Sequence, residues 1–364
     1  MNYDAVLLTS FGGPESPEEV MPFLERVTTG RGIPKERLEE VSHHYLTLGG
    51  VSPINQQNRE LLMALRIEMK ERKIDIPVYF GNRNSEPFFS RVLRDIYADG
   101  HSQVLSLVTS AYSSYSGCRQ YRENLAQALI DANLTGKMTI GKVRHYFDHP
   151  GFVTPFANGL IRALITLANE GFKPADTQIF FTTHSITTSM AQSSGPIDMH
   201  DSFESGVYVA QHLAATKAIL DLAKKQIDFE LPGWSLVYQS RSGAPHMPWL
   251  EPDIGDALRV AAGANSKAVI VIPIGFVSDH IEVVWDLDNE AKTIAEKLGM
   301  RFIRVATPGK SHEFVLGLAD LLQERLSNAE RTALSPLGPW ADFCPAGCCP
   351  NPRHELPSIA EVSL

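Results

Sequence analysis

Residues 268–298 read AVIVIPIGFVSDHIEVVWDLDNEAKTIAEKL. The stretch opens with the continuous apolar run Ala268–Ile272, which is typical of a parallel strand buried on both faces. Pro273 and Gly275 then mark a turn, and the following residues carry the pattern of a helix over 281–298. A strand that leads through a short turn into a helix is the repeating unit of an α/β fold. Ligands bind beyond the carboxyl ends of such strands, so the turn is expected to face one.

The same alternation of short strands and longer helices runs through most of the chain. Strand patterns occur at 5–8, 77–80, 103–108, 138–143, 177–181, 235–238, 268–272 and 302–305. Helical patterns lie between them, at 17–27, 34–47, 55–73, 86–98, 120–132, 153–170, 208–225, 253–263, 281–298 and 312–326. Four strands followed by four more predict an α/β fold of two similar halves, each with a four-stranded parallel sheet flanked by helices.

The length of the chain also indicates two domains. It has 364 residues, and a typical domain has about 150. The hinge is predicted near His149–Pro150–Gly151, which gives domains at 1–150 and 151–328. After Asn328 the periodic patterns stop, and LSPLGPW and FCPAGCCPNPRH are typical of loops. Residues 329–364 are therefore expected to form a tail that packs on the body.

The composition is typical of a packed globular protein, with 43% hydrophobic and 21% charged residues. The net charge of −9 argues against generic nucleic-acid binding, which needs a basic surface. The N-terminus lacks the basic region of a signal peptide. The longest apolar run, 268–277, is shorter than the roughly 20 residues that cross a membrane. We expect a cytoplasmic protein with no transmembrane segment, and a monomer, because two lobes can form a self-contained core.

Two segments carry residues that suit proton transfer or metal binding. FFTTHSI (180–186) places His184 at the carboxyl end of a strand. A histidine there either bonds to a neighbouring loop or serves as a base or metal ligand, since its pKa lies near neutrality. Glu282, Asp286 and Glu290 are spaced i, i+4 and i+8, which puts them on one face of a helix. Because like charges at this spacing repel, the row is either a solvated face or a path for a cation such as ferrous iron.

Three further segments could contact a ligand. SFGGPES (10–16) lacks the spacing of a nucleotide-binding loop, and its glycine turn fits a flat ligand as well as a phosphate. In LGGVSPINQQ (48–57), Ser52 is either a helix cap or a ligand contact. SAYSSYSGCRQYREN (110–124) combines tyrosines with Arg119 and Arg122, which suits a planar anionic ligand or simply a polar helix start.

The chain has four cysteines, and three of them lie in one short stretch: Cys344, Cys348 and Cys349. They are too few and too unevenly placed for a secreted disulfide scaffold, and they indicate a metal site. Their spacing is not the paired CxxC of a zinc ribbon. With Cys118 as the fourth ligand, it favours a [2Fe–2S] cluster over zinc. Four unrelated buried thiols are the remaining alternative.

Together, these segments resemble the ferrochelatase family. The matching stretches are spread over residues 3–310: LLTSFGGPES, HHYLTLGGVSPINQQNREL, VYFGNRN, YSGCRQY, FTTHSI and IPIGFVSDHIEVVWDLDNEA. The resemblance implies two Rossmann-like domains of the chelatase type with the active-site cleft between them. It also implies an enzyme that inserts Fe²⁺ into a porphyrin in haem biosynthesis.

The tail resembles the actinobacterial branch of that family, whose members carry a [2Fe–2S] cluster. The porphyrin expected in that branch is coproporphyrin III, and its iron complex, coproheme, leads to haem b. The resemblance makes the cluster structural or sensory and implies a transient contact with a downstream coproheme-processing enzyme. It assigns the cluster to Cys118, Cys344, Cys348 and Cys349. A protoporphyrin IX ferrochelatase and a non-catalytic haem or porphyrin carrier stay open as alternatives.

Carried over residue by residue, the resemblance makes His184 and Glu282 the catalytic pair. An imidazole and a carboxylate can accept the two pyrrole N–H protons as Fe²⁺ enters and can guide the metal. Asp286 and Glu290 match an acidic path that leads the metal inward. Porphyrin contacts are implied at Ser52, Tyr121, Tyr45 and Arg31.

The sequence departs from some relatives at two places. Phe11 stands where some members carry a tyrosine that ligates the product iron, so no phenolate ligand is expected and Phe11 is predicted to pack on the ring face. Thr28 and Thr29 stand where arginines occur in some relatives. Arg119 and Arg122 are therefore hypothetical ligands for the porphyrin propionates.

Overall fold

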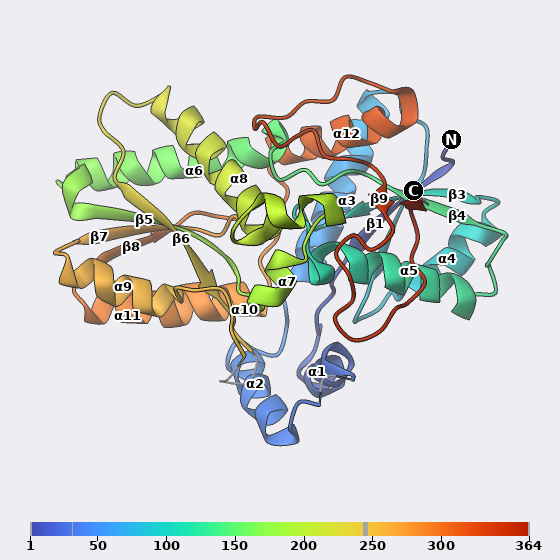
Figure 1. Ribbon diagram of the computed structural model, residues 1–364, viewed down its shortest axis with the longest axis horizontal. Helices are drawn as coiled ribbons and strands as arrows, with labels where there is room; N and C mark the ends of the chain where they lie inside the picture. The colour runs from blue at the N-terminus through green and yellow to red at the C-terminus, as the bar shows by residue number, and fades with distance from the viewer. Residues whose placement is uncertain (1, 31, 243–246, 363–364) are drawn as a thin grey trace.

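The computed structural model describes residues 2–30, 32–242 and 247–362, and it contains two parallel sheets side by side (Figure 1). The first sheet has the order β2-β1-β3-β4 and the second β6-β5-β7-β8. Every neighbouring pair of strands in both sheets is parallel. The first sheet consists of β1 (Ala5–Ser10), β2 (Val78–Asn82), β3 (Gln103–Val108) and β4 (Thr139–Lys142). The second consists of β5 (Thr177–His184), β6 (Gly233–Gln239), β7 (Ala268–Ile272) and β8 (Arg301–Arg304).

The two sheets have the same topology, which confirms the predicted pair of four-stranded Rossmann-like halves. In each, the chain starts at an inner strand, adds one neighbour and then crosses to the other side. The strand order thus reverses at β1 and at β5. The crevice at such a reversal is where open α/β sheets bind ligands.

Helices cover both sheets. Those of the first half are α1 (Val20–Thr28), α2 (Lys35–Thr47), α3 (Ile54–Glu71), α4 (Phe89–Ala98) and α5 (Gln120–Asp131). The longer helices that follow are α6 (Pro150–Asn169), α8 (Gly206–Lys224), α9 (Ile254–Gly263) and α12 (His312–Ser327). The shorter ones are α7 (Thr188–Gln192), α10 (Ile281–Val283) and α11 (Lys292–Lys297), and the 3₁₀ turns are η1 (Pro17–Glu19), η3 (Pro174–Asp176) and η4 (Ile197–Ser202).

Two segments are π-helical: η2 (Tyr115–Arg119) and η5 (Val284–Ala291). The sequence predicted one ordinary helix over 281–298, whereas the structure has α10, the π-helix η5 and α11 in succession. The difference arises because hydrophobic periodicity marks the buried face but does not distinguish i→i+4 from i→i+5 hydrogen bonds. π-Helical turns occur frequently at functional sites.

The interior is continuous from one half to the other. One apolar cluster contains Leu8 of β1, Ile179 of β5, Ile270 of β7, Phe152 of α6 and Phe314 of α12. α6 is long and apolar enough to cross a membrane by length and composition, and 67% of that stretch is buried inside the protein. Its neighbours are α8 and α12, so α6 is packed as a core helix. α12 also packs on α3 of the first half, and the domain boundary near residue 150 stays a prediction.

The tail returns to the first half. In its described part it forms only the two-residue strands β9 (Cys344–Pro345) and β10 (Glu361–Val362), which pair in parallel. Its last turn lies against α5, where the backbone N–H of Ile359 donates to the carbonyl oxygen of Arg122. Figure 1 shows the tail crossing in front of α5, while α1 and α2 project below the two sheets.

Candidate active site

His184 ends β5, at the reversal point of the second sheet. Its Nδ1 lies 2.5 Å from the carbonyl oxygen of Ser185. Because a carbonyl oxygen only accepts hydrogen bonds, Nδ1 carries the proton of the neutral ring. Nε2 is therefore the basic nitrogen, and it is the atom that the fold turns toward the acidic segment after β7.

Glu282 faces that nitrogen, with its Oε2 3.5 Å from Nε2 of His184. The two side chains are 35% and 42% exposed, so a substrate can reach both. Burial by itself lowers the pKa of His184, but the hydrogen bond and the charge of Glu282 raise it, and the net shift is upward. The pair thus combines a basic imidazole with a carboxylate that stabilises its protonated form.

The structure brings Glu282, Asp286 and Glu290 into one row along α10 and η5. Burial raises the pKa of Asp286 to about 7; the hydroxyl of Ser240, which donates to its Oδ2, opposes the rise, and the charges of both glutamates reinforce it. At the outer end of the row, Nε1 of Trp285 donates to Oε1 of Glu290 at 2.8 Å. The row therefore contains one carboxyl that can gain or lose a proton near neutral pH.

The beginning of this acidic segment is fixed against both halves of the protein. The backbone N–H of Asp279 donates to Oε1 of Gln57 on α3, at 2.9 Å. The Asp279 carboxylate in turn accepts from both terminal nitrogens of Arg304 on β8, at 3.1 and 3.2 Å. These bonds anchor the chain just before Glu282 to α3 of the first half and to β8 of the second.

An apolar wall packs against the start of the acidic row. It consists of residues from the loop after β1, from α1 and from α2, and it also holds Ile281 of α10. Phe11 packs edge-on against Phe23, with ring centroids 6.1 Å apart. Tyr45 is buried in the same cluster; burial first, and then the charges of Glu282 and Asp286, raise its pKa well above the ordinary value. Phe11 and Tyr45 thus share one apolar cluster with Ile281, the residue before Glu282.

Ser52 is buried against the glycine turn after β1. Its backbone N–H donates to the carbonyl oxygen of Pro14 at 2.8 Å. A methyl group on Gly13 would come within 2.5 Å of the Ser52 Cβ, so only glycine allows this approach. The two segments that the sequence singled out separately, SFGGPES and LGGVSPINQQ, therefore form one surface.

Arg83 is the functional candidate that sequence reasoning missed. Its guanidinium lies over the ring of Phe11 at 5.3 Å and over the ring of Tyr121 at 4.7 Å. Nε donates to Oδ1 of Asn124 at 2.9 Å. The sequence could have indicated this residue, because Arg83 directly follows β2 and therefore lies at the same carboxyl edge of the sheet as Phe11. Tyr121 is buried on α5. It is linked to Phe11 only indirectly, because the guanidinium of Arg83 stacks on both rings.

The other cations expected near the ligand lie elsewhere. Nε of Arg119 donates to Oε1 of Glu123, and its Nη2 donates to the tail carbonyl of Leu356. Nε of Arg122 donates to the tail carbonyl of Ile359. Both arginines thus hold the tail. Arg31 lies outside the described residues.

The four cysteines, Cys118, Cys344, Cys348 and Cys349, form one buried cluster of free thiols. The Sγ atoms of Cys348 and Cys349 are 3.9 Å apart. Cys349 is also bonded to the second half, because its Sγ accepts from the Gly195 N–H at 3.0 Å. Among the described residues, no group of three or more His, Cys, Asp or Glu is arranged to hold a metal ion. The donor type and burial fit a [2Fe–2S] cluster, which divides four thiolates between two irons and so needs no three ligands around one point.

Comparison with solved structures shows what the fold is similar to. SirB from Bacillus subtilis with Fe3+ superposes with a TM-score of 0.50 at 9% sequence identity, covering 90% of this chain and 97% of SirB. At this identity the likeness shows a shared fold of two parallel-sheet halves.

Sequence comparisons identify the family. The chain is 52% identical over 365 residues to the coproporphyrin III ferrochelatase of Streptomyces griseus, covering 98% of this chain and 96% of the relative. It is 50% identical over 354 residues to the coproporphyrin III ferrochelatase of Tropheryma whipplei, covering 96% and 90% of the two chains. The ferrochelatase family itself matches residues 3–326. The chain therefore belongs to the ferrochelatase family.

Proposed function

We propose that this protein inserts Fe²⁺ into coproporphyrin III and forms coproheme on the route to haem b. The observation that carries the proposal is the contact of His184 with Glu282, at 3.5 Å, beside an apolar wall that suits a macrocycle. Relatives about half identical to this chain are named for this reaction.

The chemistry requires two pyrrole N–H protons to leave as the metal enters. Nε2 of His184 is the proton acceptor, because Nδ1 is already occupied by its bond to Ser185. Glu282 stabilises the imidazolium that forms. Asp286, with a pKa of about 7, can take up and release protons near neutral pH and pass them outward. The porphyrin loses two protons and gains one Fe²⁺ ion. The total charge of the site is therefore unchanged once both protons have left.

The acidic row also suits the delivery of Fe²⁺ as a substrate. Glu290 is exposed, Glu282 lies beside His184, and Asp286 stands between the two glutamates along the segment. Carboxylates and imidazole are ligands that ferrous iron accepts, and a row of like charges is relieved when a cation passes. We assign Glu290, Asp286, Glu282 and His184 to this path.

The first half binds the porphyrin in this proposal. Phe11 packs on the ring face and offers no oxygen to the product iron. Tyr45 and Ser52 line the ring edge, and Tyr121 contributes through Arg83. Arg83 is the cation that we assign to a propionate, because it is held flat between two rings and its guanidinium fork suits a carboxylate.

We also propose that Cys118, Cys344, Cys348 and Cys349 hold a [2Fe–2S] cluster. Bound there, it would join the tail to η2 and, through Cys349 and Gly195, to the second half. The proposal is tested by the visible spectrum and by the iron and sulfide content of anaerobically purified protein. A colourless protein with one zinc would refute it.

The catalytic proposal is tested by mixing the protein anaerobically with Fe²⁺ and either coproporphyrin III or protoporphyrin IX. We expect faster formation of the metalloporphyrin spectrum with coproporphyrin III, which presents four propionates. Faster insertion into protoporphyrin IX would show that protoporphyrin IX, and not coproporphyrin III, is the preferred substrate. Tight binding of metalloporphyrin without insertion would make the protein a carrier.

A further inference from the structure

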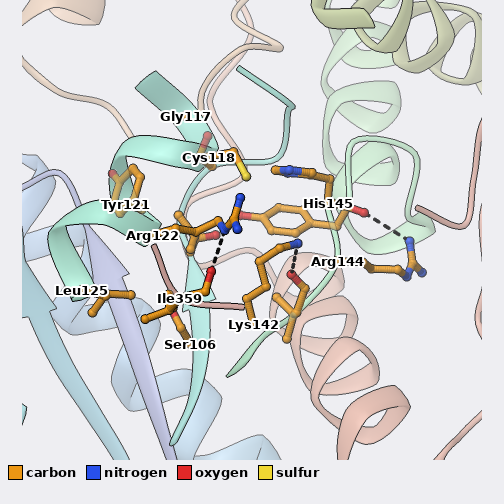
Figure 2. Close-up of a pocket in the computed structure, with 14 residues that line it drawn as sticks. Ser106, Gly117, Cys118, Tyr121, Arg122, Leu125, Lys142, Arg144, His145 and Ile359 are labelled. Carbon is orange, nitrogen blue, oxygen red and sulfur yellow. Dashed lines mark hydrogen bonds between the residues drawn. The ribbon is translucent and has the colours of Figure 1, made fainter. Parts of the chain in front are cut away.

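A small buried cavity lies directly beside the cysteine cluster. Its volume is about 20 Å³, room for about one water molecule. Figure 2 shows Cys118, Arg122, Lys142 and His145 around it. None of the roles proposed above uses the last two residues, although both are buried.

Lys142 is a buried cation without an anionic partner in the described part of the chain. It is the last residue of β4 and is 4% exposed. Its Nζ donates to the carbonyl oxygen of Val143 at 3.4 Å, and none of the described carboxylates lies within ion-pair distance of it. A buried ammonium in this state is costly unless a negative charge is supplied nearby.

Arg122 is in a similar position. It is 2% exposed, and its Nε and Nη2 donate to Ile359 and Ser358 of the tail, both neutral partners. Its Nη1 is buried and has no hydrogen-bond partner among the described residues. Arg144, which lines the same cavity, shows the contrast: its guanidinium binds both carboxylate oxygens of Glu324, at 2.7 and 2.8 Å.

His145 adds no third charge. Burial, followed by the charge of Lys142, lowers the pKa of His145 to about 3, so its ring is neutral at physiological pH. The cavity wall therefore carries two positive charges that the described protein groups do not balance.

The negative charge that would balance them lies next to the cavity. Cys118 lines the same cavity as Lys142 and Arg122, and it belongs to one buried cluster with the three tail cysteines. The two cations are thus within electrostatic reach of the thiols. A four-thiolate [2Fe–2S] cluster is anionic, and its reduction adds one more negative charge.

We propose that Lys142 and Arg122 are the built-in counter-charges of the metal cluster, and that they set its affinity and its reduction potential. The inference rests on the proposed cluster. Neither residue is a ligand; each acts on the cluster through its charge.

The test compares Lys142→Met, which removes the charge at similar length, with Lys142→Arg, which keeps it. The exposed Lys137 provides the matched control Lys137→Met, since it precedes the same strand. The reduction potential is measured by spectroelectrochemical titration of the visible bands. We expect Lys142→Met to shift it to more negative values, by roughly a tenfold change in the reduction equilibrium, about 59 mV for one electron. Lys142→Arg and Lys137→Met should stay near wild type.

A second readout separates charge from packing. Without the cluster, Lys142 is an unbalanced buried charge, so Lys142→Met should raise the melting temperature of chelator-stripped protein. With the cluster, the same variant should release iron to a chelator several-fold faster than wild type. A plain packing defect would lower the melting temperature in both states, and that result would overturn the proposal.

The remaining outcomes are also decisive. An unchanged potential and unchanged iron release in Lys142→Met, with a normal wild-type cluster, would refute the counter-charge role alone. A wild-type protein that takes up no cluster on anaerobic reconstitution would refute the proposed cluster, and the counter-charge role with it.

Discussion

The Nε2 atom of His184 and the Oε2 atom of Glu282 lie 3.5 Å apart, although one residue ends β5 and the other lies in α10, which follows β7. β5 and β7 are neighbours in the second sheet, so their carboxyl ends open at the same edge. The fold thereby brings a base and a carboxylate together although the two residues lie far apart in the chain. The proposed function gives each residue a distinct role: His184 accepts a proton, and Glu282 stabilises the charge that results.

This division of roles predicts the effect of removing either member. His184→Ala should lower the rate of iron insertion by a factor of about 10²–10⁴, the usual contribution of a positioned general base. Glu282→Gln should lower it less, because the base remains and only the stabilisation of its charged form is lost. Anaerobic initial rates with Fe²⁺ and coproporphyrin III measure both effects. Glu296→Gln, on the exposed side of α11, is the control and should behave as wild type.

Asp286 predicts a dependence of stability on pH. Its pKa of about 7 in the folded protein exceeds its ordinary value of 3.8, because burial and two neighbouring glutamates disfavour the charge. Between these values the folded state binds more protons than the unfolded state, so stability falls as pH rises through the window. Asp286→Asn should therefore raise the free energy of unfolding at pH 8 by about 1–3 kcal/mol, with little gain near pH 4.

Denaturant unfolding at the two pH values checks this prediction. The control is Asp288→Asn on the same π-helix, whose carboxylate is paired with Arg304 at 2.6 Å. That variant should be slightly destabilised at pH 8. An equal loss of stability in both variants would contradict the raised pKa of Asp286. Iron insertion should be slower in Asp286→Asn, since the gain in stability comes from a functional charge.

The strands and most helices could be predicted because their signals are local. The apolar run Ala268–Ile272 has the predicted bounds, since strands buried on both faces are marked by continuous hydrophobicity. The π-helix after it could not be predicted, because its buried residues follow almost the same spacing as those of an ordinary helix. Asp286 still interacts electrostatically with both Glu282 and Glu290, so the sequence could indicate the candidate row despite the wrong helix type.

The arginines show what a single sequence could not provide. Arg119 and Arg122 stand beside tyrosines in the chain and were expected at the ligand. In the structure they donate hydrogen bonds to carbonyl oxygens of the tail instead. Arg83 was passed over because its stacking partners Phe11 and Tyr121 come from distant segments. Both errors have one cause: local composition indicates that a cation is present, whereas long-range packing decides what it faces.

Phe11 predicts a difference in the product complex. With no oxygen at this position, the ferric product should show no charge-transfer band from a protein phenolate. Phe11→Tyr should introduce such a band and slow the release of product, because the new hydroxyl can reach the metal from the ring face. Visible spectra of the ferric complexes check the first expectation, and the rate of transfer to an external haem acceptor checks the second. Tyr45→Phe, which removes a buried hydroxyl in the same wall, should leave the spectrum unchanged.

Arg83 predicts a selective loss of porphyrin binding. If its guanidinium holds a propionate, Arg83→Leu should raise the KM for coproporphyrin III by about 10- to 100-fold, which corresponds to the 1.5–3 kcal/mol of a charged hydrogen bond. The kcat should change much less, since Arg83 does not touch the reacting nitrogens. Arg83→Lys should recover part of the loss, because it keeps the charge but loses the planar fork. Arg91→Leu, at an exposed position on α4, controls for the general loss of a positive charge. A fall in kcat at unchanged KM would show instead that Arg83 positions Phe11 and Tyr121 and does not bind the substrate.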